Sequence, residues 1–274
     1  MRLTKHHGLG NDFLVLLDPD GTQAVTPDDA VALCHRHTGV GADGLLVGGP
    51  PRNGADLSMV LLNADGSRAE MSGNGIRCLV QAALQHGMVT GPEVAVATDA
   101  GRRTVTVVDQ RDARTHRLSV DMGPAKVGEE RPAWVSGDVV QALEVDLGNP
   151  HVVLLWGADE LPGRDELIAI GDRIDGATPG GANVEIIRPV ADGAVIDMVV
   201  FERGVGPTLA CGTGACASAV AAHRWGLTGP TAAVHMPGGT VEVVVGDPVL
   251  LVGDAESVAA VEVPWPPVAG EVSR

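Results

Sequence analysis

Short runs of valine, leucine and isoleucine recur along the chain, and turn residues such as glycine and proline separate them. Apolar runs of about four to eight residues between turn signals are typical of β-strands. The pattern predicts strands at 13–17, 57–62, 94–98, 104–108, 118–122, 152–155, 184–189, 195–201, 234–236, 240–245, 249–252 and 258–263. The chain is therefore expected to be rich in strands.

Helices are expected at a few places between these strands. Thr26 is a suitable N-cap and Pro27 suits the first turn, so a helix should run from here to about residue 37. A longer helix should begin at Gly73, because the apolar residues that follow fall on one face. Further helices are expected at 164–174 and 212–225. One long helix among many strands in each half predicts an α+β fold, in which a curved, mostly antiparallel sheet or barrel wraps around a central helix.

The chain carries one segment twice. Residues 59–75 (MVLLNADGSRAEMSGNG) align without a gap with residues 198–214 (MVVFERGVGPTLACGTG), at an offset of 139 (211 − 72). Residues 9–17 align with residues 147–155 at an offset of 138 (149 − 11). These matches predict two pseudo-symmetric domains, 1–122 and 123–253, with the tail 254–274 joining the first. A site between them would receive one reactive side chain from each, Ser72 and Cys211.

The charge of the chain limits its partners. A formal net charge of −16 argues against nucleic acid and against anionic membrane surfaces. The sequence has no apolar run of about 18 residues that would span a membrane. Its N-terminus also lacks the apolar stretch of a signal peptide. We therefore expect a cytoplasmic protein that acts on a small molecule.

The four cysteines form neither a disulfide framework nor a zinc-binding pattern. Cys34, Cys78 and Cys216 lie in helix-like apolar patterns, which favours buried, inert thiols. The segment Cys34-His-Arg-His37 suggests a metal site, but a basic helix end followed by Thr38-Gly39 explains it better. We therefore expect no metal.

A reactive residue followed by Gly-x-Gly at a helix start indicates an anion site. The first N–H groups of a helix have no internal partner, and glycines let a ligand approach the backbone. Two such helix starts, behind Ser72 and Cys211, would hold one carboxylate and acidify the hydrogen on the neighbouring carbon. Groups on opposite faces of that carbon would then invert it without a cofactor. Cys211 suits this role, because a helix N-terminus lowers a thiol pKa, whereas a serine needs an adjacent base.

Several blocks together resemble the diaminopimelate epimerase family. They are HGLGNDF (7–13), GVGADGLL (39–46), NADGSRAEMSGNGIRC (63–78), GNPHVV (148–153), ERGVG (202–206) and ACGTGACA (210–217), and they occur in the family's order over most of the chain. The resemblance implies conversion of LL-diaminopimelate to the meso form without a cofactor, in lysine and peptidoglycan synthesis. It also implies two pseudo-symmetric domains with the site in the cleft between them, and a homodimer.

The resemblance also assigns roles to single residues. Cys211 matches one catalytic thiol, Ser72 stands where the other is expected, and His151 and Glu202 match the groups that assist them. Gly73, Asn74, Gly212 and Thr213 match the backbone donors to the reacting carboxylate. The residues that match the other substrate-holding positions are Asn11, Gly44, Asn63, Asn149, Asn183, Glu202 and Arg203. Pro207 replaces an acidic residue usual in the family.

Ser72 leaves several interpretations open. One interpretation is an inert or slowed site in which Cys211 is the single competent base. Another is a working pair in which His151 activates Ser72. Replacement by Cys78 is disfavoured, because that residue lies six positions along the helix and should point away. Rival functions are a cofactor-free racemase for another amino acid and a non-catalytic binding protein on the same fold. A nucleotide-binding enzyme is a third rival, although the full Gly-x-Gly-x-x-Gly fingerprint and a Walker lysine are missing.

Overall fold

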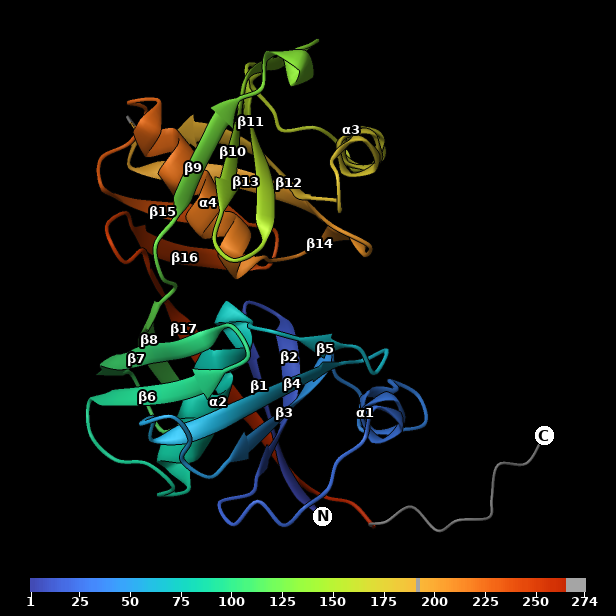
Figure 1. Ribbon diagram of the computed structural model, residues 1–274, viewed down its shortest axis with the longest axis vertical. Coiled ribbons are helices and arrows are strands. Elements are labelled where there is room, and N and C mark those ends of the chain that lie inside the picture. The colour runs from blue at the N-terminus through green and yellow to red at the C-terminus, as the bar shows by residue number, and fades with distance from the viewer. Residues whose placement is uncertain (191–192, 265–274) are drawn as a thin grey trace, which may run out of the picture. The chain divides into compact units, whose positions relative to one another are not determined.

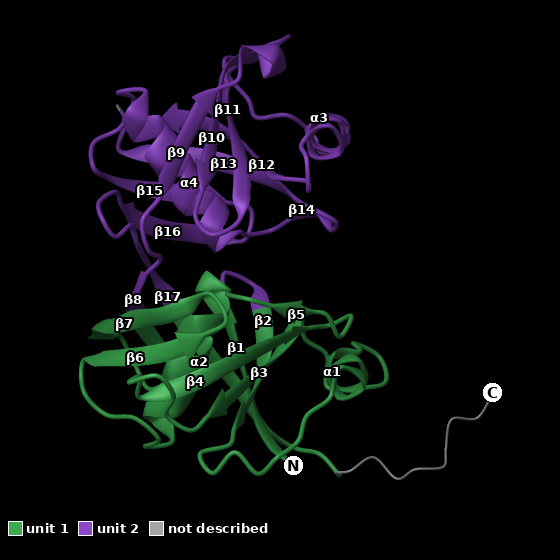
Figure 2. Cartoon of the chain, in the orientation of Figure 1, with its two compact units in different colours: residues 1–8, 12–116, 255–274 green, residues 9–11, 117–254 purple. Residues whose placement is uncertain are grey.

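The computed structural model describes residues 1–190 and 193–264 (Figure 1). The chain forms two compact units, coloured separately in Figure 2. Unit 1 consists of Met1–Gly8, Asp12–His116 and the described residues from Ala255 onward. Unit 2 consists of Leu9–Asn11 and Arg117–Asp254. The strand β17 (Leu250–Glu262) supplies residues to both units.

Unit 1 is a closed barrel around one helix. Its strands are β1 (Arg2–Gly8), β2 (Asn11–Leu17), β3 (Gly44–Gly49), β4 (Leu57–Asn63), β6 (Glu93–Thr98), β7 (Gly101–Gln110), the first two residues of β8 (Thr115–Asp121) and the part of β17 from Ala255 onward. They pair in the order β1, β2, β3, β4, β6, β7, β8, β17, and β17 returns to β1. The pairs β2–β3 and β4–β6 are parallel, whereas β3–β4, β6–β7 and β1–β17 are antiparallel.

The helix α2 (Gly73–Gln85) fills this barrel and packs against β1, β3, β4 and β7. Ile76, Leu79 and Val80 are fully buried, as the spacing of apolar residues predicted. A shorter helix, α1 (Pro27–Cys34), covers β3 and β4, and a capping box between Thr26 and Asp29 starts it. Burial of these apolar faces fixes the position of the α2 N-terminus in unit 1.

Unit 2 is a curved sheet around a second helix. Its strands pair in the order β9 (Lys126–Glu130), β10 (Val139–Asp146), β11 (Pro150–Trp156), β12 (Asn183–Val190), β13 (Val195–Glu202), β15 (Thr231–Met236), β16 (Gly239–Val244) and β17. The helix α4 (Gly212–Arg224) packs against β10, β11, β12, β13, β15 and β16. The helix α3 (Arg164–Ala177) packs on β12 and β13, where Gly171 lies so close to Phe201 that a Cβ would be 2.2 Å from its ring.

The two units share their strand registers as well as their order of elements. Phe13 pairs with Gly44 in unit 1, and His151 pairs with Asn183 in unit 2, at offsets of 138 (151 − 13) and 139 (183 − 44). The short strands β5 (Arg68–Ala69) and β14 (Gly206–Thr208) each form a hairpin with the strand before the central helix. The predicted α+β fold of two pseudo-symmetric halves, each with a mostly antiparallel sheet around a helix, is confirmed.

Some elements differ from the expectation. The first helix ends at Cys34 instead of residue 37, because the ring nitrogen Nδ1 of His35 accepts from the backbone N–H of His37 and Thr38 and holds a turn there. The runs 249–252 and 258–263 belong to one strand, β17. The pattern missed β1, β3, β5, β9, β10, β14 and a 3₁₀ turn at Pro132–Trp134. The sequence also predicts that the Pro-rich stretch 264–267 and the terminus after it are loose, and residues 265–274 of that segment lie outside the described residues. No helix in the described parts of the chain is both long and apolar enough to cross a membrane.

Candidate functional site

Ser72 and Cys211 are the N-cap residues of α2 and α4. Ser72 Oγ accepts a hydrogen bond from the backbone N–H of Gly75 at 3.0 Å, and Cys211 Sγ accepts one from Gly214 at 3.3 Å. Both caps have extended backbone angles, φ −140° and ψ 125° for Ser72 and φ −129° and ψ 115° for Cys211. Each residue therefore lies at the N-terminus of its helix, at the positive end of the helix dipole, where an anion is stabilised.

A fully buried arginine of α2 contacts the first turn of the helix. Arg77 donates to the carbonyl oxygen of Gly73 at 3.0 Å and to the Asn74 side-chain oxygen at 2.7 Å. Asn74 itself is 3% exposed. The guanidinium thus fixes the Asn74 side chain and puts a positive charge behind the candidate anion-binding turn. Arg77 was not among the predicted site residues, although it lies inside a segment that carried the family resemblance.

The remaining candidates of the first half are placed by turns and packing. The Asn63 side-chain amide donates to Ser67 Oγ at 2.9 Å, within the turn that joins β4 to β5. Gly44 opens β3, and a Cβ there would lie 2.9 Å from the carbonyl oxygen of Leu62, so the strand pair leaves no room for a side chain. Asn11 belongs to unit 2 together with Leu9 and Gly10.

In unit 2 a chain of polar contacts links a buried carboxylate to the candidate thiol. Glu185 Oε1 lies 2.7 Å from His151 Nδ1, and His151 Nε2 lies 3.1 Å from Asn149 Oδ1. The Asn149 amide reaches Thr213 Oγ1 at 3.4 Å, and that hydroxyl lies 3.5 Å from Cys211 Sγ. Four residues that the sequence analysis selected therefore meet in one network, and Glu185 is a member that it did not select.

Glu202 has a partner of its own. Thr208 Oγ1 donates to Glu202 Oε1 at 2.5 Å, across the β13–β14 hairpin. Pro207 sits in the same hairpin opposite Phe201. Pro207 has no backbone N–H to donate, and the short strand β14 forms in spite of this.

Asn183 and Arg203 contact each other through the backbone. The Arg203 backbone N–H donates to Asn183 Oδ1 at 3.0 Å, and the Asn183 side-chain amide donates to the carbonyl oxygen of Pro150 at 3.3 Å. The Arg203 guanidinium donates to the carbonyl oxygen of Gly180 at 3.0 Å. Asn183 is 6% exposed, so it acts as a buried connection between β11, β12 and the turn after β13.

The expectation of a lowered Cys211 pKa is wrong for this structure. Burial raises the pKa of the Cys211 thiol well above its usual value, and the carboxylates of Glu202 and Glu185 raise it further. The hydrogen bonds from Thr213 and Gly214 lower it by less. Desolvation and two negative neighbours thus outweigh the helix N-terminus. Cys211 is 7% exposed and rests as a thiol.

The other cysteines are buried, as predicted. Burial raises the pKa of Cys34 to about 11 and that of Cys78 to about 12. A thiol that remains protonated in apolar surroundings is a poor nucleophile and a poor base. Cys78 is fully buried within α2 and does not replace the missing thiol at position 72.

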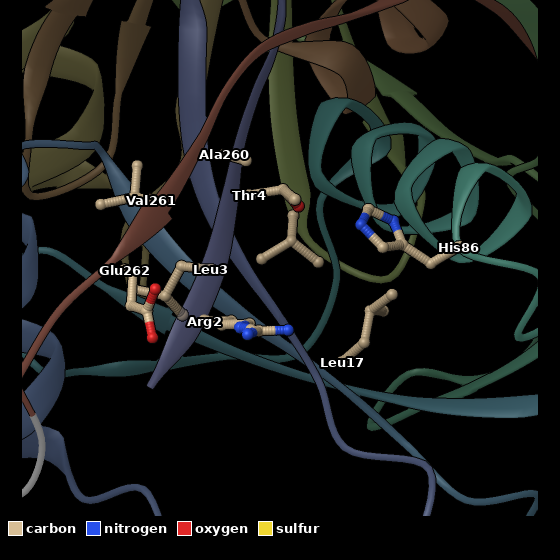
Figure 3. Close-up of a pocket in the computed structure, with 9 residues that line it drawn as sticks. Arg2, Leu3, Thr4, Leu17, His86, Ala260, Val261 and Glu262 are labelled. Carbon is tan, nitrogen blue, oxygen red and sulfur yellow. The ribbon is translucent and has the colours of Figure 1, made fainter.

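A hollow of about 460 Å³ opens in unit 1, away from the candidate residues (Figure 3). Arg2, Leu3, Thr4, Val15, Leu17, His86, Ala260, Val261 and Glu262 line it. None of the residues selected for chemistry contributes to this lining. The hydrogen-bond network around Cys211 therefore defines the candidate site better than the size of a pocket does. Among the described residues no three metal-ligating side chains cluster.

Solved structures share this architecture. One is a probable proline racemase from Agrobacterium radiobacter, with a TM-score of 0.68 and 20% identity, covering 98% of this chain and 94% of that one. Another is a predicted epimerase from Pseudomonas aeruginosa, with a TM-score of 0.70 and 15% identity, covering 96% of this chain and 98% of that one. The chain thus shares its fold with a probable racemase and a predicted epimerase.

Sequence comparison narrows this class. The family model for diaminopimelate epimerase matches residues 3–128 and 144–255. Relatives named diaminopimelate epimerase include a protein of Desulfitobacterium hafniense, 41% identical over 87% of this chain and 89% of its own length. A second, from Pelotomaculum thermopropionicum, is 39% identical over 97% of this chain and 99% of its own length. The chain belongs to the diaminopimelate epimerase family and is an isomerase.

Proposed function

We propose that the chain epimerises diaminopimelate between its LL and meso forms by proton transfer at one α-carbon, without a cofactor. The observation that carries the proposal is the matched pair of helix caps. Ser72 and Cys211 occupy equivalent positions and accept the same hydrogen bond, three residues along the chain, from Gly75 and Gly214. Duplicated caps of this kind suit one substrate carboxylate held by two helix N-termini, with a proton-transfer group on each face.

The chemistry requires one proton to leave and another to arrive. One group removes the α-hydrogen as a proton, and the electron pair left on carbon spreads onto the held carboxylate. The opposite group then donates its proton to the other face of the carbon. Cys211 is the thiol of this pair and is protonated at rest, which suits it to donate its proton once the opposite group has removed the α-hydrogen. Ser72 is the opposite group, and His151 and Glu202 assist the transfers.

Substrate recognition is assigned to backbone and side-chain groups around these caps. Gly73, Asn74, Gly212 and Thr213 supply the N–H groups for the reacting carboxylate. Asn11, Gly44, Asn63, Asn149, Asn183, Glu202 and Arg203 bind the rest of the substrate, including its distal amino-acid end. Arg203 suits a carboxylate because its guanidinium binds two oxygens at once. We place the reaction in lysine and peptidoglycan synthesis and expect a homodimer.

Ser72 should slow this reaction, because a hydroxyl is a far weaker acid than a thiol. The test is α-hydrogen exchange in heavy water, measured separately with the LL and meso isomers. Exchange from one isomer without inversion indicates Cys211 as the single competent group, whereas inversion at a normal rate indicates that His151 activates Ser72. A protein that binds diaminopimelate but exchanges no hydrogen, even with Ser72→Cys, is a binding protein and contradicts the proposal. Exchange of a single-ended amino acid instead would favour a racemase for another substrate.

A further inference from the structure

His151 and Glu185 form a buried pair, ionic when His151 is protonated, that the fold does not need. Both side chains are fully buried, and 2.7 Å separates His151 Nδ1 from Glu185 Oε1. Unit 1 has the same two positions on its paired parallel strands, and Phe13 and Leu46 occupy them, at offsets of 138 (151 − 13) and 139 (185 − 46). Phe13 is 3% exposed and Leu46 is fully buried.

Two apolar residues therefore suffice at this place in the barrel. Replacing a buried ion pair by packed apolar residues is often neutral or stabilising, because both ions lose their hydration in the interior. Unit 1 provides this replacement within the same chain. The desolvation of Glu185 and His151 in unit 2 must then serve something other than the stability of the fold.

The contacts of Glu185 point toward Cys211. Glu185 Oε2 is buried and has no hydrogen-bond partner in the described structure. A Cβ on Gly214, the residue whose N–H binds Cys211 Sγ, would lie 2.5 Å from Glu185 Oε1. The carboxylate thus lies beside the first turn of α4, and only a glycine at position 214 leaves it room.

We propose that Glu185 is a positioning residue for the epimerisation, acting through His151. Glu185 accepts a hydrogen bond from the N–H at His151 Nδ1. The opposite ring nitrogen, Nε2, then faces Asn149, and through it Thr213 and Cys211. A carboxylate behind a histidine fixes the tautomer and favours the imidazolium that forms when the histidine takes a proton. Neither Phe13 nor Leu46, the apolar residues at these positions in unit 1, can do this. This inference rests on the proposed function.

The first experiment needs no substrate. Nitrogen-15 chemical shifts of the His151 ring report its tautomer and protonation, with His151→Gln used to assign the signals. In wild type Nδ1 should carry a proton at every pH, and in Glu185→Gln the ring should lose its second proton at lower pH, because the negative charge is gone. Cys211 is the other titratable group of this network, and Glu202 is a charged neighbour of Cys211, so the same titration is repeated in Cys211→Ser and Glu202→Gln. An unchanged His151 titration in Glu185→Gln overturns the inference.

The second experiment measures catalysis. Glu185→Gln should lower kcat for α-hydrogen exchange about 10- to 100-fold and leave KM nearly unchanged. The same change in a His151→Gln background should have no further effect. Asp197→Asn is the matched control, because it removes a carboxylate from the ion pair between Arg188 on β12 and Asp197 on β13, outside the network, and should leave kcat unaltered. Equal losses with and without His151, or an unchanged kcat, overturn the inference.

Two further variants cover the other outcomes. If Glu185→Gln does not fold, Glu185→Asp keeps the charge and withdraws it by one carbon, and it should still lower kcat while it folds normally. If wild type exchanges too slowly to measure, the kinetic series is run in Ser72→Cys. Absence of exchange in both backgrounds rejects the proposed function, and the histidine titration then decides the role of Glu185 by itself.

Discussion

Ser72 and Cys211 occupy one position in two copies of the same structure. Each is the N-cap of a helix of 13 residues, and each accepts from the N–H three residues further on. The oxygen and the sulfur therefore share a geometry but differ in acidity. This relationship makes a serine–cysteine exchange a small change in structure and a large change in chemistry.

Ser72→Cys should raise the rate of epimerisation by about 100-fold or more, because a thiol, with a usual pKa of about 8.5, is a far stronger acid than a hydroxyl. The folded structure should tolerate the sulfur, since Cys211 already caps α4 in the same way. The measurement is inversion of LL-diaminopimelate, followed by chiral chromatography. Ser72→Ala is the control for the cap: it should cost about 1 kcal/mol of stability and give no gain in rate. An unchanged rate in Ser72→Cys would mean that another departure, such as Pro207, limits the enzyme.

Alkylation should report the raised pKa of Cys211. In the free protein at pH 7–8, just below the usual thiol pKa of about 8.5, iodoacetamide should modify Cys211 more slowly than free cysteine. Glu202→Gln should speed the reaction, because loss of a negative neighbour lowers the thiol pKa and increases the thiolate fraction. Peptide mass spectrometry separates Cys211 from Cys34, Cys78 and Cys216. Alkylation of Cys211 faster than free cysteine would show that the helix N-terminus prevails after all.

Gly214→Ala should impair catalysis although alanine is the better helix former by about 1 kcal/mol. The added Cβ would lie 2.5 Å from Glu185 Oε1, so the carboxylate must move away from His151. Gly176→Ala in α3 is the matched control, because nothing lies within 4 Å of its Cβ position and a gain in stability is expected there. Exchange kinetics and thermal unfolding of both variants test this. Full activity in Gly214→Ala would show that the position of Glu185 is unimportant.

Asp12→Asn should destabilise the protein at neutral pH and not in acid. Burial acts to raise the pKa of Asp12, but hydrogen bonds from Arg36 and Lys5 outweigh it and lower the pKa to about 2. A carboxyl group with a depressed pKa stabilises the fold above its unfolded pKa of about 4 and ceases to do so as the pH falls through about 2. The loss should be on the order of 2 kcal/mol at pH 7. Urea unfolding across this pH range tests it, with exposed Asp20→Asn as a control. A pH-independent loss would contradict the role of Asp12 charge.

Patterns local in the sequence predicted most of the structure. Apolar runs located most of the long strands, and the Ser72 and Cys211 segments located both central helices, because burial and helix periodicity act over neighbouring residues. The strand β3 was missed because Gly44, Gly48 and Gly49 weaken a strand pattern. Gly48 is needed there, since a Cβ would lie 2.8 Å from Leu79 of the helix inside the barrel. That requirement is set by tertiary packing and has no local signal.

The site was predicted as a set of residues and not as a network. His151 and Glu202 followed from family resemblance, but Glu185 lies 34 positions from His151, and only the parallel pairing of β11 with β12 brings them together. The acidity of Cys211 was predicted in the wrong direction for the same reason. A helix start is visible in the sequence, whereas the two carboxylates around the sulfur are brought there by the fold.

The double duty of the capping atoms affects how any alanine scan of this enzyme should be interpreted. At positions 72 and 211 the atom proposed to move a proton also secures the first turn of a helix. Truncation to alanine removes both the reactive atom and the hydrogen bond that caps the helix. An inactive alanine variant therefore does not show which of the two losses abolished activity. The substitutions Ser72→Cys and Cys211→Ser keep the cap hydrogen bond and change mainly the acidity of the side chain. They therefore test the proton-transfer role more directly at both positions.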